Sequence, residues 1–160
     1  MAEKKILFVC LGNICRSPAA EAVMTRLLNN NNLVDSVEVD SAGTIDYHEG
    51  EPADARMRVY AEKRGYNLNS FARKFNAATD FEKFDYIITM DNNNFEDIKA
   101  LDLDNKFTNN IFRMMDFSKN YDDTEIPDPY YGGREGFENV LDILEDADAG
   151  LLEKLENDLR

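Results

Sequence analysis

Two residues near the N-terminus have the types and the spacing that phosphate chemistry uses. Cys10 precedes Arg16 by six positions. A cysteine thiolate is a strong nucleophile, and an arginine guanidinium can donate two parallel hydrogen bonds to two oxygens of a phosphate-like group, which lysine cannot do. Such a pair occurs by chance about one time in twenty at average residue usage. A cysteine buried in the core and an unrelated surface arginine could have the same spacing in the sequence, so the spacing alone does not establish a site.

The residues between this pair fit a loop that wraps around an anion. Gly12 and Asn13 tolerate the left-handed backbone that such a wrap needs. A loop that leads into a helix N-terminus points several backbone N–H groups at one place, and the helix end adds partial positive charge. These groups and Arg16 would favour a thiolate on Cys10, and Ser17 can donate a hydrogen bond to it. The predicted phosphate-binding residues are Leu11, Gly12, Asn13, Ile14, Cys15 and Ser17.

A strand before this loop and a helix after it would hold it in place. The apolar run 6–9 is typical of a buried parallel strand. Ser17 is a good N-cap and Pro18 is preferred at the first helical position, which predicts a helix whose apolar residues continue to Leu28. Further strands are expected at 37–41, 86–90 and 111–115, and further helices at 54–63, 93–101 and from Phe137 to Leu159.

The alternation of strands and helices predicts the fold. We expect residues 1–160 to form one three-layer α/β domain, in which a four-stranded parallel sheet has helices on both faces. Ligands in such folds bind beyond the carboxyl ends of the strands. Cys10 directly follows the first expected strand, so its loop lies where a binding site is expected.

The composition excludes several classes of function. The net charge of −14 on 160 residues argues against binding to nucleic acid or to an anionic membrane, because both need a basic surface. No segment fits a secretory signal or a membrane span, and the two cysteines lie too close together for a disulfide framework. One histidine and two cysteines leave few ligands for zinc, although a metal bound only by carboxylates stays open. We expect a cytoplasmic protein, with export without a signal peptide left open, that is a monomer or a weak dimer.

Several segments together resemble one enzyme family. Residues 9–18, which read Val-Cys-Leu-Gly-Asn-Ile-Cys-Arg-Ser-Pro, are similar to the phosphate-binding loop of low-molecular-weight protein tyrosine phosphatases. Further similar segments follow in the family's order at 20–22, 40–44, 84–87, 90–91 and 128–132, so the resemblance covers nearly the whole chain. It implies an enzyme that hydrolyses phosphotyrosine in proteins or peptides through a phosphocysteine on Cys10, with Arg16 binding the phosphate. No metal or cofactor is implied.

The reaction also needs a group that protonates the leaving oxygen and later activates water. Composition cannot select it, because the chain has 32 acidic residues. Asp128 stands out between Pro127 and Pro129, although an ordinary turn aspartate would look the same. The resemblance assigns Asp128 as the general acid and then the general base.

The family resemblance also implies roles around the loop. Tyr130 and Tyr131 would line the mouth of the pocket and Tyr47 the opposite wall, where they can stack on an aromatic leaving group. Asn13 and Ser41 resemble the pair whose hydrogen bond supports the loop.

The sequence departs from the family at one support position and adds one redox hypothesis. Vertebrate members often add a histidine to the Asn–Ser network, but the corresponding segment 70–73 has none, and His48 is expected to be a surface residue. Cys15 could form a reversible disulfide with Cys10 under peroxide.

Four rival functions fit the residues less well. A thiol-dependent arsenate reductase needs further cysteines to resolve its arsenic–sulfur adduct, and none follows Cys15, so this function would require an external thiol. By resemblance, arginine phosphatases of this family have a threonine where this chain has Ile14. A phosphocarrier domain would not need both Arg16 and Asp128, and a binding module without activity would not need every catalytic group. The resemblance therefore favours a phosphotyrosine phosphatase.

Overall fold

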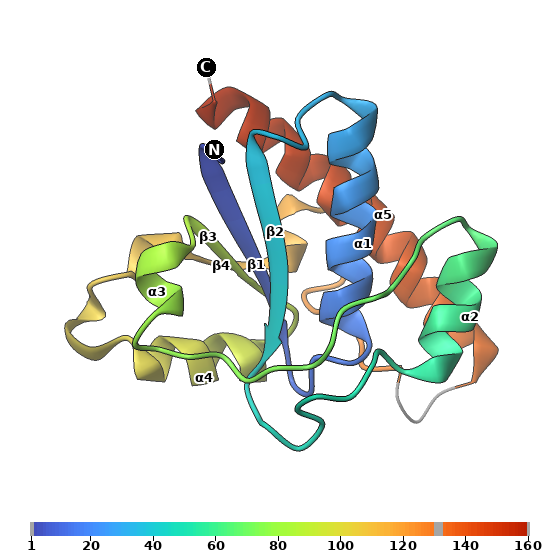
Figure 1. Ribbon diagram of the computed structural model, residues 1–160, viewed down its shortest axis with the longest axis horizontal. Coiled ribbons are helices and arrows are strands. Elements are labelled where there is room, and N and C mark those ends of the chain that lie inside the picture. The colour runs from blue at the N-terminus through green and yellow to red at the C-terminus, as the bar shows by residue number, and fades with distance from the viewer. Residues whose placement is uncertain (1, 130–132, 160) are drawn as a thin grey trace.

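The centre of the fold is a parallel β-sheet, seen in a computed structural model that describes residues 2–129 and 133–159 (Figure 1). In this part of the chain the sheet has four strands in the order β2-β1-β3-β4, and every neighbouring pair is parallel. The strands are β1 (Lys4–Cys10), β2 (Val37–Gly43), β3 (Tyr86–Thr89) and β4 (Ile111–Arg113). The predicted four-stranded parallel sheet is confirmed.

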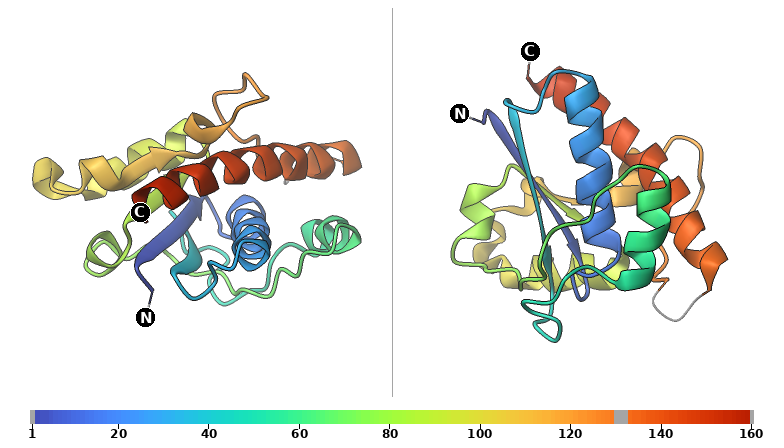
Figure 2. Two further views of the ribbon diagram at one scale, coloured as in Figure 1. Left: turned by 90° about the horizontal axis from the view of Figure 1, so that it is seen from above. Right: turned by 45° about the vertical axis from the view of Figure 1, so that its right-hand side comes forward.

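Helices cover both faces of this sheet (Figures 1 and 2). One face carries α1 (Arg16–Asn30), α2 (Ala55–Lys63) and the long α5 (Arg134–Asp158), and the other carries α3 (Asp80–Lys83) and α4 (Asn92–Leu101). Side chains alternate between the faces along β1, so that Ile6 and Phe8 join the first core and Leu7 and Val9 join the second. Short 3₁₀ turns occupy Leu103–Asn105, Thr108–Asn110 and Met114–Phe117.

The start of α1 differs from the sequence prediction. The helix begins at Arg16 with Cys15 at the N-cap position, and no side chain caps it. Ser17 is not the N-cap, because its hydroxyl is engaged by the side chains of Cys10 and Asn13 instead. Pro18 still lies in the first turn, where a helix does not need a backbone N–H. The short helix α3 was not among the predicted elements.

The carboxyl ends of the strands meet at one edge of the sheet. The register aligns Cys10 with Gly43, and Val9 with Thr89. Gly43 is required by this packing, since a Cβ atom there would lie 2.7 Å from the carbonyl oxygen of Leu11. The loops that follow β1, β2 and β3 are therefore brought together. No helix within residues 2–129 and 133–159 is long and apolar enough to cross a membrane.

One carboxyl group in α5 is buried without a hydrogen-bond partner among the described residues, which lowers the stability of the fold. The side chain of Asp148 is 0% exposed, and neither carboxyl oxygen has a hydrogen-bond partner among the described residues. Burial raises the pKa of Asp148 well above its ordinary value, because an isolated charge is poorly solvated there.

Replacing this carboxyl should stabilise the protein. Asp148→Ala should raise the free energy of unfolding at neutral pH by about 1–2 kcal/mol, because it removes an unpaired buried polar group. The folded-state pKa lies above the unfolded value near 3.8, so the contribution of Asp148 to stability is most favourable in acid and is lost as the pH rises. The gain from the substitution should therefore shrink at about pH 4.5.

Urea unfolding of both proteins measures this gain. Asp97→Ala is the control, because Asp97 is an exposed aspartate within α4. This substitution measures only the effect of the higher helix propensity of alanine. It should change the free energy of unfolding by no more than about 0.5 kcal/mol. A loss of stability in Asp148→Ala at neutral pH would contradict the expectation.

Candidate active site

Residues 10–16 form a tight loop between β1 and α1. Asn13 adopts the left-handed conformation with φ of +58°, so the left-handed turn falls on the asparagine and not on Gly12. Gly12 has another consequence, since a Cβ atom there would lie 2.9 Å from the ring of His48, so the glycine lets this ring pack against the loop. The backbone N–H of Thr44 donates to the carbonyl oxygens of Cys10 (3.0 Å) and Leu11 (2.9 Å), which ties the loop to the end of β2.

The thiol of Cys10 lies at the end of a buried hydrogen-bond chain. The Oγ of Ser17 is 3.0 Å from the Sγ of Cys10, and the Nδ2 of Asn13 donates to the same Oγ over 2.8 Å. Because this Oγ already accepts a hydrogen bond from Asn13, the hydroxyl hydrogen of Ser17 is available for the sulfur. A hydroxyl donor at this distance stabilises a thiolate.

Arg16 is a buried cation held from two other parts of the chain. Its side chain is almost completely buried, and its Nη1 donates to Asp91 Oδ2 over 2.7 Å and to the carbonyl oxygen of Ile126 over 3.0 Å. Although burial acts against the charge, the pKa of Arg16 lies above its ordinary value because Cys10 and Asp91 stabilise the cation. Asp91 is itself fixed, since its Oδ1 caps α4 by accepting from the backbone N–H of Asn94 over 2.7 Å.

The loop that carries Asp128 is anchored against Arg16. The backbone N–H of the fully buried Ile126 donates to the carbonyl oxygen of Met90 over 2.8 Å, and its own carbonyl accepts from Arg16. Asp128 Oδ2 then lies 3.6 Å from Nη2 of Arg16, with 43% of the side chain exposed. Sequence reasoning missed Ile126. The available signal was a single large apolar residue within the polar segment 122–128.

These groups line one cavity of about 310 Å³. The structure brings Cys10, Arg16 and Asp128 together there, as the sequence predicted. The residues that line the cavity are Cys10, Leu11, Gly12, Ile14, Cys15, Arg16, Ile45, Tyr47, His48 and Asp128. A nucleophile, an anion-binding cation and a carboxyl group in one cavity have the parts needed for group transfer from a phosphate ester.

The walls of the cavity differ in part from expectation. Tyr47 lines it with 74% of the residue exposed, whereas Tyr130 and Tyr131 lie outside the described residues. His48 was expected to be a surface residue but also lines the cavity, because Gly12 lets its ring approach the loop, and its Nδ1 is 3.0 Å from Glu51. Ile45 is a further apolar wall residue that the sequence analysis did not select.

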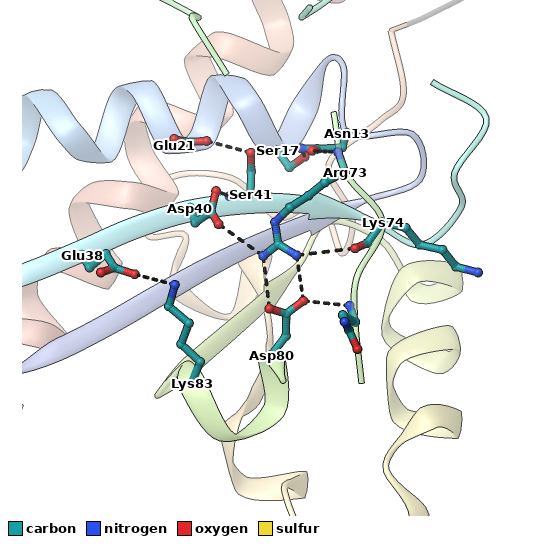
Figure 3. Close-up of polar contacts among 11 residues, drawn as sticks. Asn13, Ser17, Glu21, Glu38, Asp40, Ser41, Arg73, Lys74, Asp80 and Lys83 are labelled. Atoms are coloured by element: carbon teal, nitrogen blue, oxygen red, sulfur yellow. Dashed lines mark hydrogen bonds and ion pairs between the residues drawn. The ribbon is translucent and has the colours of Figure 1, made fainter. Parts of the chain in front are cut away.

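The expected hydrogen bond between Asn13 and Ser41 is replaced by two other pairings. Ser41 donates from Oγ to Glu21 over 2.7 Å, while the Oδ1 of Asn13 accepts from the backbone N–H of Arg73 over 3.0 Å (Figure 3). The strand register explains the difference. Ser41 lies opposite Phe8, two positions before the level of the loop.

Cys15 is a second thiol in the same cavity. Cys10 and Cys15 are both free and buried. Burial, followed by the nearby carboxylate of Asp54, raises the pKa of Cys15 well above its ordinary value, so this thiol keeps its proton. No group of three or more His, Cys, Asp or Glu side chains within residues 2–129 and 133–159 is placed to hold a metal ion.

Comparison with known proteins relates nearly the whole chain to one family. The family described as low molecular weight phosphotyrosine protein phosphatase matches residues 5–160. A putative low molecular weight protein-tyrosine-phosphatase from Synechocystis is 45% identical over 155 residues, which cover 97% of this chain and 98% of the relative.

Two solved structures place the site in context. A protein tyrosine phosphatase from Entamoeba histolytica, crystallised with Hepes in its active site, superimposes with a TM-score of 0.94 at 49% identity and covers 98% of this chain and 99% of that one. A structure titled drosophila arginine phosphatase reaches a TM-score of 0.87 at 32% identity and covers 94% and 97%. The fold is therefore shared by proteins that are named for different substrates.

The ion pair between Arg16 and Asp91 should matter for turnover. Asp91→Asn should lower kcat/KM for p-nitrophenyl phosphate about 10–100-fold, because an amide can still cap α4 but cannot hold the guanidinium by charge. Steady-state kinetics measure the effect. Asp102→Asn is the matched control, since Asp102 is a buried aspartate at the other end of α4 that accepts from Phe107 and Thr108. It should leave kcat/KM unchanged. Full activity in Asp91→Asn would show that Arg16 keeps its position without this carboxylate.

Proposed function

The chain belongs to the low molecular weight phosphotyrosine protein phosphatase family, and we propose that it removes phosphate from phosphotyrosine in proteins through the cavity between Cys10, Arg16 and Asp128. The observation that carries this proposal is the buried arrangement of Cys10 beside Ser17, with Arg16 and Asp128 lining the same cavity. The matching relatives are named as protein-tyrosine phosphatases. Hepes carries a sulfonate, a tetrahedral anion like a phosphoryl group, so its place in the relative's active site supports phosphate binding here.

In the proposed first step, the thiolate of Cys10 attacks the phosphorus atom. Arg16 and the backbone N–H groups of the loop bind the phosphoryl oxygens and stabilise the charge that develops on them. A sulfur–phosphorus bond forms as the phosphorus–oxygen ester bond breaks, and protonated Asp128 gives its proton to the leaving phenolic oxygen. The products of this step are a phosphocysteine and a free tyrosine hydroxyl.

The second step restores the enzyme. Asp128, now a carboxylate, takes a proton from water while the water oxygen attacks phosphorus and the sulfur–phosphorus bond breaks. Inorganic phosphate leaves, and the hydroxyl of Ser17 stabilises the returning thiolate of Cys10.

The cavity walls favour an aromatic ester. Leu11, Ile45 and Tyr47 are exposed apolar or aromatic residues along the cavity, and they offer contact area to a phenyl ring. A second candidate substrate is phosphoarginine, because one matching structure is titled an arginine phosphatase. Ile14 favours the aromatic substrate, since this side chain lines the cavity and offers no hydroxyl to a guanidinium group.

A panel of matched peptides tests the substrate class. Phosphotyrosine, phosphoserine and phosphoarginine peptides of one sequence should be hydrolysed with phosphotyrosine preferred by at least about tenfold in kcat/KM. Phosphate release with and without a chelator gives the rates, and the chelator should have no effect. Cys10→Ser should abolish turnover and keep the fold. Faster turnover of phosphoarginine would replace the proposed substrate, and full activity of Cys10→Ser would reject the mechanism.

The same assay tests Asp128. Asp128→Ala should lower kcat for phosphotyrosine about 10²–10⁴-fold, with a smaller change in affinity for inorganic phosphate. The loss should be least for esters of acidic phenols, which leave without a proton. Asp123→Ala is the control, because Asp123 is an exposed aspartate in the same loop. Equal losses for all leaving groups would assign general acid catalysis to another residue.

We also propose that Cys15 protects Cys10 during oxidation. Peroxide would convert the Cys10 thiolate to a sulfenic acid. The sulfur of Cys15 would then attack the sulfur of Cys10 as the sulfur–oxygen bond breaks, and the leaving hydroxide would take the Cys15 proton and depart as water. Dithiothreitol should then restore most activity to the wild type after peroxide treatment but little to Cys15→Ala. Equal recovery in the two proteins would contradict this role. Cytoplasmic location and a monomer or weak dimer stay predictions.

A further inference from the structure

The orientation of the Asn13 amide decides which way the hydroxyl of Ser17 points. If the amide were turned by half a rotation, its oxygen would face Ser17, and the hydroxyl would donate to Asn13 and not to Cys10. The observed amide presents its nitrogen to Ser17 at 2.8 Å. The reason lies on the other side of the amide, where the backbone N–H of Arg73 donates to Oδ1 over 3.0 Å.

A backbone N–H can only donate, so Arg73 determines which group donates and which accepts in each hydrogen bond between Arg73 and Cys10. Arg73 N–H requires the oxygen of Asn13, which leaves the nitrogen of Asn13 for Ser17. The oxygen of Ser17 is then an acceptor, and its hydrogen is directed to the sulfur of Cys10, 3.0 Å away.

The backbone of Arg73 is held by its own side chain and by β2. Its carbonyl oxygen accepts from the backbone N–H of Gly43 over 2.8 Å. Its guanidinium forms a bidentate pair with Asp80, with Nη1–Oδ2 at 2.9 Å and Nη2–Oδ1 at 3.2 Å, and Nη2 also reaches Asp40 Oδ2 at 3.2 Å (Figure 3). Arg73 therefore links β2, α3 and the loop that carries Cys10.

The guanidinium of Arg73 stays charged because it pairs with a carboxylate that is itself buried and held. Asp80 is buried, and its Oδ2 also accepts from the backbone N–H of Asn76 over 2.8 Å. Burial acts to lower the pKa of Arg73, but the hydrogen bond to Asp80 and the charge of Asp40 raise it above its ordinary value. A planar, permanently charged fork suits this double pairing, and lysine would not reproduce it.

We propose that Arg73 is a positioning residue for the thiolate of Cys10, acting through Asn13 and Ser17. The proposal rests on the proposed function, because a directed hydrogen bond to sulfur matters when Cys10 attacks and is expelled. Arg73 is not one of the residues that line the cavity. Its effect should therefore appear in the ionisation of the thiol and in kcat, with little change in substrate affinity.

A second arginine that pairs with several carboxylates provides the matched control. Arg64 is also partly buried and pairs with three carboxylates of α5, Glu138, Asp142 and Glu145. Within the described chain, the hydrogen bonds that its guanidinium donates end on α5 and not on residues 10–17. Arg64→Met should cost stability as Arg73→Met does, without changing the chemistry of Cys10.

The test measures the rate at which iodoacetate alkylates Cys10 as a function of pH, with the modified residue identified by mass spectrometry. Arg73→Met should move the midpoint of this profile upward by about one pH unit, as expected for loss of a directed hydrogen bond to a charged group. It should lower kcat about tenfold with less than about a threefold change in KM. Asp80→Asn should also raise the alkylation midpoint and lower kcat, but by smaller amounts than Arg73→Met. Arg73→Lys should give values between those of the wild type and Arg73→Met.

A double-mutant cycle separates this role from a general loss of structure. In the Ser17→Ala background, Arg73→Met should produce no further shift of the alkylation midpoint, because both changes break one chain of contacts. An unchanged midpoint in Arg73→Met and Asp80→Asn, or an equal shift in Arg64→Met, would overturn the proposal. If Arg73→Met does not fold, the alkylation midpoints of Asp80→Asn and Arg73→Lys test the proposal in its place. Alkylation does not require turnover, so this result stands apart from the peptide panel that tests the proposed function.

Discussion

An arginine residue that is 2% exposed in a protein of net charge −14 needs specific partners for its guanidinium group. Burying an unpaired cation costs several kcal/mol, so the position of Arg16 requires a carboxylate and a carbonyl oxygen beside it. Asp91 comes from the end of β3 and Ile126 from the loop before Asp128. The loop with the proposed general acid is consequently held against the loop with the proposed nucleophile, and a buried cation is kept beside Cys10 within an acidic protein.

The two sides of the proposed nucleophile are supported by separate networks. On the anion side, Arg16 is held by the carboxyl edge of β3 and by Ile126. On the sulfur side, Ser17 and Asn13 connect Cys10 to the backbone of Arg73, whose ion pairs involve β2 and α3. Both networks reach the loop at the carboxyl edge of the parallel sheet, so partners outside the loop hold both sides of Cys10.

The fold does not by itself select a substrate. Solved structures that share it with TM-scores of 0.94 and 0.87 are titled a tyrosine phosphatase and an arginine phosphatase. The parts that these chemistries share are a nucleophile and an anion-binding loop, whereas the walls of the cavity contact the rest of the substrate. In this chain the walls include Ile14, Ile45 and Tyr47 together with His48, which packs on Gly12. Substrate preference therefore depends on a few side chains that the sheet does not determine.

Local patterns in the sequence were enough for the strands, most helices and the loop of Cys10, because apolar periodicity and turn residues act over a few neighbours. The assignment of Asp128 needed the family resemblance as well, since many aspartates share its local features. The tertiary structure alone decided that Ile126 anchors the acid loop, that Ser41 pairs with Glu21, that Ser17 faces sulfur and does not cap α1, and that Arg73 orients Asn13. These pairings join residues up to 110 positions apart. They depend on strand register and on the direction of single donors and acceptors, which no local pattern records.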